Sequence, residues 1–196
     1  MTDIKEFRRA AHDIDPIFLK RWSPRSFLNK EVPEDVLHSV FEAARWAPSA
    51  ANMQPWRFVF ARTEADRAKF LSFINDSNVT WCKNAPVLIA VISKMDRGPG
   101  KDNITHAFDT GAAWGYMALE ASRKGLITHG MGGFDRAKAK EVLDIPDNYF
   151  VNAIIALGYQ ADIHALHEDY HDREKPSDRH PVESFLSEGV FTDENN

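Results

Sequence analysis

One stretch decides the fold class of this chain, the apolar run Pro86-Val87-Leu88-Ile89-Ala90-Val91-Ile92. Apolar residues fill the run without alternation, which is typical of a strand that is buried on both faces of a sheet. A second run of this kind, VNAIIAL, spans residues 151–157. Shorter strand patterns occupy residues 56–61 (WRFVFA) and 126–128. The sequence therefore predicts a central sheet whose inner strands are covered on both sides.

Helical patterns alternate with these strands. Apolar residues recur at helical spacing between Pro33, which suits a first helical position, and Pro48, which ends the pattern. The segment 105–124 is apolar and rich in small residues, and Gly125 ends it, so we expect a long helix in the core or at a subunit interface. Three further helices are predicted, at residues 3–12, at residues 64–74 and, with Asp135 as its N-cap, at residues 135–143. This alternation favours an α/β or α+β sandwich around one sheet.

Length and composition fit one folded domain. The chain has 196 residues, of which 43% are hydrophobic and 27% are charged, and these values exclude a disordered or collagen-like protein. After residue 162 the sequence turns polar and has no long periodic element. We therefore expect residues 1–196 to form a single domain in which residues 162–196 are a polar C-terminal arm.

Charge and cysteine content indicate the class of partner and the compartment. The 24 Lys and Arg residues against 29 Asp and Glu residues give a net charge of −5, which disfavours nucleic acid, although a few local arginines can still hold one phosphate. The single cysteine, Cys82, allows no intrachain disulfide. The N-terminus has no apolar signal core, and no apolar run approaches the roughly 18 residues of a membrane span. We expect a cytoplasmic protein that binds neither nucleic acid nor membrane.

Three segments carry residues suited to ligand binding. Residues 21–27 (RWSPRSF) place two arginines beside a serine, which can hold a phosphate dianion but also suit an ordinary solvated loop. Residues 47–56 (APSAANMQPW) are small and polar between prolines, and they can approach a flat ligand or form a rigid turn. Residues 129–135 (HGMGGFD) let the main chain pass beside a ligand and donate N–H groups to it. This segment lacks the G-x-G-x-x-G spacing of a dinucleotide fingerprint.

The order and spacing of these segments, followed by Arg179-His180-Pro181, resemble the FMN-dependent nitroreductase family over about Pro16 to Glu183. The resemblance implies an α+β fold, a three-layer α/β/α sandwich with a central, mostly antiparallel sheet. It also implies a domain-exchanged homodimer with FMN at the subunit interface.

The same resemblance implies a set of cofactor-binding residues. Those implied at the FMN phosphate are Arg21, Ser23 and Arg179, with Trp22 contacting the cofactor partly through its backbone. Arg25 would reach the pyrimidine edge of the flavin, where a fixed positive charge favours the reduced ring, and Asn78 would add a polar contact. The residues implied to cover the ring from the other subunit are Pro48, Ser49, Ala50 and Asn52. Those implied to run along the ring, with an N–H near N5, are Gly130, Met131, Gly132 and Gly133.

The function that the resemblance implies is electron transfer through the flavin. NAD(P)H would give a hydride to FMN, and a small electron-poor acceptor such as a nitroaromatic or a quinone would take the electrons in the same pocket. Since the flavin carries the chemistry, no catalytic side chain is expected. A different class of function stays open, because proteins of one fold can differ in reaction: a flavin-binding protein that stores, senses or consumes FMN without NAD(P)H turnover.

A rival motif lies in the arm. His167-Glu168-Asp169-Tyr170-His171 matches H-E-x-x-H, the zinc protease signature. Zinc binding would require both histidines on one face of a buried helix and a third ligand. Because the flanking residues are polar and provide no apolar face, we expect a solvated histidine-rich segment and no metal site.

Overall fold

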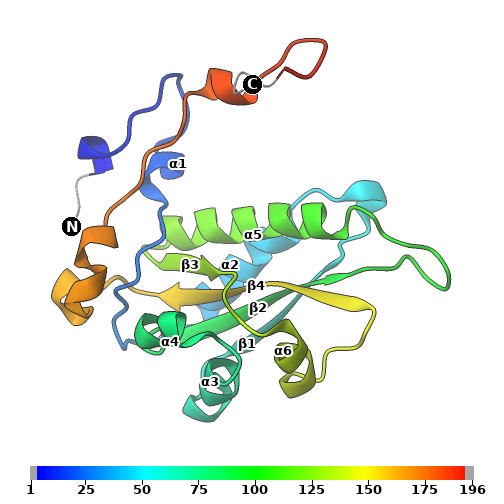
Figure 1. The fold of residues 1–196 in the computed structure, drawn as a ribbon, viewed down its shortest axis with the longest axis horizontal. Coiled ribbons are helices and arrows are strands. Elements are labelled where there is room, and N and C mark those ends of the chain that lie inside the picture. Colours follow the sequence, from blue (N-terminus) through cyan, green and yellow to red (C-terminus); the bar gives the residue numbers. More distant parts are fainter. Residues whose placement is uncertain (1–3, 193–196) are drawn as a thin grey trace.

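The structure is a computed structural model that describes residues 4–192, and a four-stranded antiparallel sheet lies at its centre (Figure 1). The strands are β1 (Trp56–Ala61), β2 (Val87–Lys94), β3 (Ile127–Met131) and β4 (Tyr149–Gly158), in the order β1-β2-β4-β3. All three pairings are antiparallel. The four predicted strands are confirmed, and β2, β3 and β4 extend past their predicted ends.

The apolar run of β2 serves two cores at once, since successive side chains of a strand point to opposite faces. Val87, Ile89 and Val91 pack in one apolar cluster, while Leu88, Ala90 and Ile92 pack in the other. None of these six side chains is more than 2% exposed. This burial on both faces is the reason why the run shows no polar alternation.

Helices cover both faces of the sheet (Figure 1). One layer holds α2 (Glu34–Arg45) and α5 (His106–Arg123). The other holds α3 (Glu64–Leu71), α4 (Asp76–Cys82) and α6 (Arg136–Val142). The predicted Asp135 cap is confirmed, because its carboxylate accepts a hydrogen bond from the backbone N–H of Lys138 at 3.0 Å. The expected α+β fold with a central antiparallel sheet is confirmed.

Two predicted helices differ from the structure, and the helix α4 was not predicted. The helix predicted over residues 3–12 is only a 3₁₀ turn, η1 (Ile4–Glu6), among the described residues, because Arg8 is bound to distant carbonyl groups. The helix α3 ends at Leu71 instead of residue 74, because Ile74 forms a β-bridge with Phe134. The helix α4 has a polar, partly β-branched sequence that gave no helical pattern, and its buried end, Trp81 and Cys82, holds it in the core.

Beyond β4 the chain leaves the sandwich. Residues 162–192 contain three 3₁₀ turns, η3 (Ile163–Ala165), η4 (Glu168–Arg173) and η5 (Val182–Phe185). This part of the arm passes the short helix α1 (Ile17–Lys20) and the N-terminal segment (orange to red beside blue in Figure 1). Within residues 4–192, no helix is both long enough and apolar enough to cross a membrane.

Candidate functional site

A cavity of about 300 Å³ lies between the segment after α1 and the arm. Six cationic side chains line it: Arg8, Arg21, Arg25, Arg173, Lys175 and Arg179. Among the described residues, no carboxylate forms an ion pair with any of the six. We call this space the cation cavity. Ser23, Ser177 and His129 also line it, so hydroxyl groups lie beside the positive charges. Such a set of donors suits a phosphate group.

Arg8 connects the parts of the chain that surround the cation cavity. Its guanidinium donates to the carbonyl oxygens of Ser177 (2.7 Å), Leu19 (3.0 Å) and Arg21 (2.7 Å), and the residue is 7% exposed. The sequence analysis missed Arg8, because one arginine in a charged N-terminal segment carries no recognisable spacing. Its bonds tie the N-terminal segment, α1 and the arm together.

Electrostatics in the cation cavity favour an incoming anion. Burial, and then the charge of Arg179, lower the pKa of both Arg8 and Arg21. Burial, and then the charge of Arg173, lower the pKa of Arg25. Guanidinium groups nevertheless stay protonated at neutral pH. Their mutual repulsion is therefore relieved when an anion binds among them.

His129 and Trp81 support the segment that carries Arg25. The pKa of His129 is lowered mainly by burial, so the ring is neutral, and its Nδ1 donates to the carbonyl oxygen of Pro24 at 3.0 Å. The His129 ring lies 4.5 Å from the ring of Trp81, and the Arg25 guanidinium carbon lies 6.0 Å from that indole. Arg25 also donates to the carbonyl oxygen of Arg173 at 3.3 Å. These contacts hold the Pro24 carbonyl group and the side chain of Arg25.

The glycine segment begins where the cation cavity ends, since Gly130 follows His129. Gly130 and Gly132 are exposed, whereas the side chain of Met131 is buried in the core and leaves only its backbone for a ligand. The predicted residues Asn78 and Gly133 are brought together, because the Asn78 amide donates to the Gly133 carbonyl oxygen at 3.2 Å. A Cβ on Gly133 would lie 2.8 Å from that amide nitrogen, so a glycine permits this approach.

The predicted covering residues Pro48, Ser49, Ala50 and Asn52 lie elsewhere. The N–H of Ala50 donates to Asp109 at 3.2 Å, in the first turn of α5, and Asp109 is only 3% exposed. Ala51 and Asn52 have φ angles of 49° and 54°, a left-handed conformation that is uncommon for residues with a side chain. The loop is thus held in a strained shape at the N-terminal end of α5.

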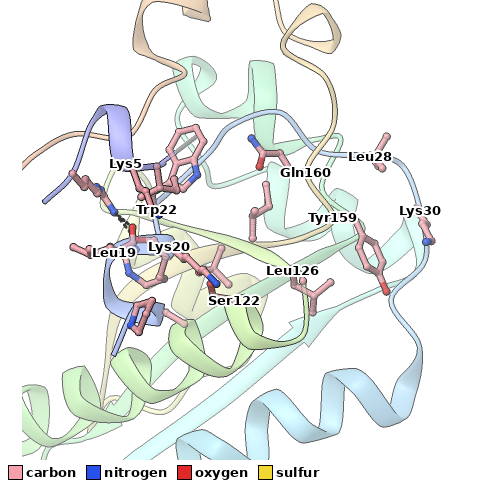
Figure 2. A pocket seen from close by; sticks show the side chains of 18 residues that line it. Lys5, Leu19, Lys20, Trp22, Leu28, Lys30, Ser122, Leu126, Tyr159 and Gln160 are labelled. Carbon is pink, nitrogen blue, oxygen red and sulfur yellow. Dashed lines mark hydrogen bonds between the residues drawn. The ribbon is translucent and has the colours of Figure 1, made fainter. Parts of the chain in front are cut away.

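A larger cavity marks the opposite end of α5. Its volume is about 640 Å³, and Ala118 and Ser122 from the last turns of α5 line it. It shares Arg8, Arg21 and Trp22 with the cation cavity. Figure 2 shows Trp22, Leu126 and Tyr159 around this space, with Lys20 and Lys30 among the other side chains that line it. Since α5 has 18 residues, a length of about 27 Å separates its ends. Within one chain, the Pro48 loop and the cation cavity therefore do not meet.

Of the histidine pair of the arm, His171 lies in the 3₁₀ turn η4 and His167 is the N-cap of that turn. The ring of His167 accepts from the N–H of Asp169 as a cap, and His171 Nε2 lies 3.2 Å from the carbonyl oxygen of Leu166. A 3₁₀ helix has three residues per turn, so residues four apart do not share a face. Over residues 4–192, no group of three His, Cys, Asp or Glu side chains is placed to hold a metal ion.

Comparisons with known proteins agree on one family. The family model described as "Nitroreductase family" matches residues 19–80 and 74–159. An NADH dehydrogenase of Thermus thermophilus is 31% identical over an alignment of 201 positions, gaps included, which covers 86% of this chain and 92% of the relative. A Stenotrophomonas maltophilia protein, provisionally named NADH dehydrogenase/NAD(P)H nitroreductase, is 28% identical over 165 residues. The alignment covers 74% of this chain and 84% of that protein. A solved structure of an oxidoreductase containing FMN has a TM-score of 0.92 and 42% identity, covering 95% of this chain and 97% of that one.

Proposed function

Because the chain belongs to the nitroreductase family and is an NAD(P)H-dependent oxidoreductase with FMN as its cofactor, we propose that its acceptor is an electron-poor small molecule, such as a nitroaromatic or a quinone. FMN, when bound, supplies the hydride and electron chemistry. The observation that supports the place of the cofactor is the cation cavity, where six cationic groups that form no ion pair among the described residues face one small space. An anionic cofactor is the ligand that such a space fits.

The chain's own residues bind and orient the cofactor. We assign the phosphate to Arg21, Ser23 and Arg179, which line the cation cavity, with Trp22 beside them. The ring is assigned to the exposed glycine segment and Asn78, with Arg25 at its pyrimidine edge, where a fixed positive charge stabilises negative charge on the ring. No acid, base or nucleophile of the chain is required in this scheme.

The visible spectrum tests the proposed function. The purified protein is expected to be yellow, to lose this colour under anaerobic NADH or NADPH, and to regain it when a nitroaromatic or a quinone is added. Since both substrates use one pocket, steady-state kinetics are expected to be ping-pong. A yellow protein that keeps its colour under both nicotinamides, with any acceptor present, would instead support FMN storage, sensing or consumption.

A homodimer is the second part of the proposal. The Pro48 loop lies at the end of α5 that is remote from the cation cavity, so it can cover only the FMN of a second copy. The exposed face of α5 is apolar, and Phe108 and Tyr116 are 81% and 44% exposed. The arm likewise exposes Phe185 and Phe191 at 66% and 87%, and such side chains suit a partner surface. We propose that each chain covers its partner's cofactor with this loop and packs the end of its arm, which carries Phe185 and Phe191, on its partner.

Light scattering is expected to give the mass of two chains in solution. The variant Phe108→Glu places a charge on the exposed face of α5 without touching the core, so it is expected to give folded monomers that bind FMN weakly. Circular dichroism checks that the variant is folded. A wild-type protein that is monomeric with FMN bound would contradict this arrangement of loop and arm. The cytoplasmic location and the single-domain extent of residues 1–196 stay predictions.

A further inference from the structure

Glu174 forms a buried junction between the arm and the arginine segment. The residue is 8% exposed, which is rare for a glutamate. Its carboxylate accepts the N–H of Arg25 at 2.9 Å to each oxygen, the N–H of Ser26 at 3.0 Å and the Ser26 hydroxyl at 2.9 Å. Hydrogen bonds to an ionised acceptor are stronger than neutral ones. The junction is thus a strong attachment of the arm to residues 25–26.

This junction attaches the arm through main-chain amides, and the charge of Glu174 acts on the Arg25 side chain only as a pKa-raising influence that is smaller than burial and the charge of Arg173. Glu174 stands between Arg173 and Lys175 in the sequence, and all three residues lie at or beside the cation cavity. Among the described residues, its carboxylate makes no ion pair with any guanidinium or ammonium group. Because its oxygens accept from main-chain amides and one hydroxyl, the cationic side chains stay available to a ligand.

A second attachment acts with the first. Arg8 donates to the carbonyl oxygen of Ser177 at 2.7 Å, three residues along the arm from Glu174. Together the two contacts hold residues 173–179 against the segment that carries Arg21 and Arg25. In addition to burial, Arg179 of the arm then lowers the pKa of Arg21, and Arg173 lowers that of Arg25. Glu174 and Asp178 offset this repulsion in part, and a bound dianion relieves it further.

We propose that Glu174 is a positioning residue that docks the arm on the cofactor phosphate, so that arm docking and phosphate binding are coupled. The inference rests on the proposed function, in which the cation cavity holds the FMN phosphate. Glu174 contacts neither the cofactor nor a substrate, and it acts through the backbone of Arg25 and Ser26. By linkage, a phosphate that needs the docked arm stabilises the docked arm to the same extent.

The first test compares two ligands that differ only in the phosphate. Glu174→Gln keeps the shape of the side chain but removes its charge and turns an amide group toward N–H donors. We expect the dissociation constant for FMN to rise on the order of tenfold, and that for riboflavin to rise less, because Glu174 also holds the backbone of Arg25 beside the ring. The matched control is Glu183→Gln, an exposed glutamate of the same arm, which is expected to bind both ligands as the wild type does.

The second test measures the arm directly by hydrogen exchange. Inorganic phosphate is expected to slow exchange over residues 173–179 in the wild type and in Glu183→Gln, but not in Glu174→Gln. Ser26→Ala removes one of the four hydrogen bonds of the junction, so phosphate is expected to slow exchange over residues 173–179 less in this variant than in the wild type. This variant tests the inference if Glu174→Gln does not fold.

Two outcomes overturn the inference. The first is an affinity result for Glu174→Gln: an equal loss of FMN and riboflavin affinity would indicate a general structural defect, and no loss of either would indicate that Glu174 has no role in binding. The other is protection of residues 173–179 by phosphate in that variant. A wild-type protein that binds neither FMN nor phosphate would contradict the proposed function itself, and so the two failures are distinguishable.

Discussion

Arg21→Ala is expected to weaken FMN binding by about 1.5–3 kcal/mol, the range for a hydrogen bond to a charged group that is removed from water. Arg21 is half-buried at the cation cavity, and burial lowers its pKa, so its charge is poorly solvated before a ligand arrives. The phosphate is therefore a better partner for it than water is. A fluorescence titration with FMN measures the change, which corresponds to roughly a tenfold to hundredfold rise in the dissociation constant.

The neighbouring Lys20→Ala serves as the control for Arg21→Ala. Lys20 is exposed and lines the larger cavity without lining the cation cavity, so its loss is expected to leave FMN binding nearly unchanged. Equal FMN affinity in Arg21→Ala and in the wild type would refute the assignment of Arg21 to the phosphate. Arg21→Ala is also expected to make FMN binding less sensitive to salt, because one screened attraction is gone.

Gly158→Ala is expected to lower the free energy of unfolding by about 3 kcal/mol, at the upper end of the range for overpacking a core. A Cβ on this buried glycine would lie 2.5 Å from Cδ and 2.8 Å from Cγ of Pro86, and 3.2 Å from Phe27. The proline ring cannot turn away as a flexible side chain does, so the end of β4 must move. Phe27 closes the arginine segment, and weaker FMN binding is expected to accompany the loss of stability.

Denaturant unfolding of the FMN-free protein measures this loss. The control is Gly132→Ala, since no atom lies within 4 Å of a Cβ at that position and its φ is ordinary for a residue with a side chain. Gly132→Ala is expected to unfold like the wild type. If Gly158→Ala and the wild type unfold at the same denaturant midpoint, the end of β4 moves away from Pro86 at no cost in stability, and the predicted clash is refuted.

Local patterns were enough to predict most of the sheet and the long helix. A continuous apolar run such as 87–92 is stable only when both faces are covered, so its burial follows from its composition alone. The cap of α6 is equally local, because Asp135 reaches an N–H only three residues away. The helix α4 was not predictable in this way, since its stability comes from the burial of Trp81 against other elements.

Some residues of the candidate site could be predicted from local patterns, and others could not. Short motifs marked Arg21, Ser23, Arg25 and Arg179, and the structure brings all four to one cavity, although their contacts with FMN stay predictions. No motif marked Arg8 or Glu174, which join the two ends of the chain: Arg8 binds Ser177, 169 residues away, and Glu174 binds Arg25, 149 residues away. In the sequence they are ordinary charged residues, and only their burial against distant backbone groups gives them a role.

The sequence by itself determined the strands and the chemical types available for binding, because these follow from composition and spacing within short segments, and its motifs resemble those of the family. The tertiary structure alone decided which charges share a cavity and which are left without a partner. It also decided that the Pro48 loop lies at the far end of α5 from the arginines. The physical reason is that burial and charge pairing depend on distances between segments remote in the chain, which spacing along the sequence does not fix.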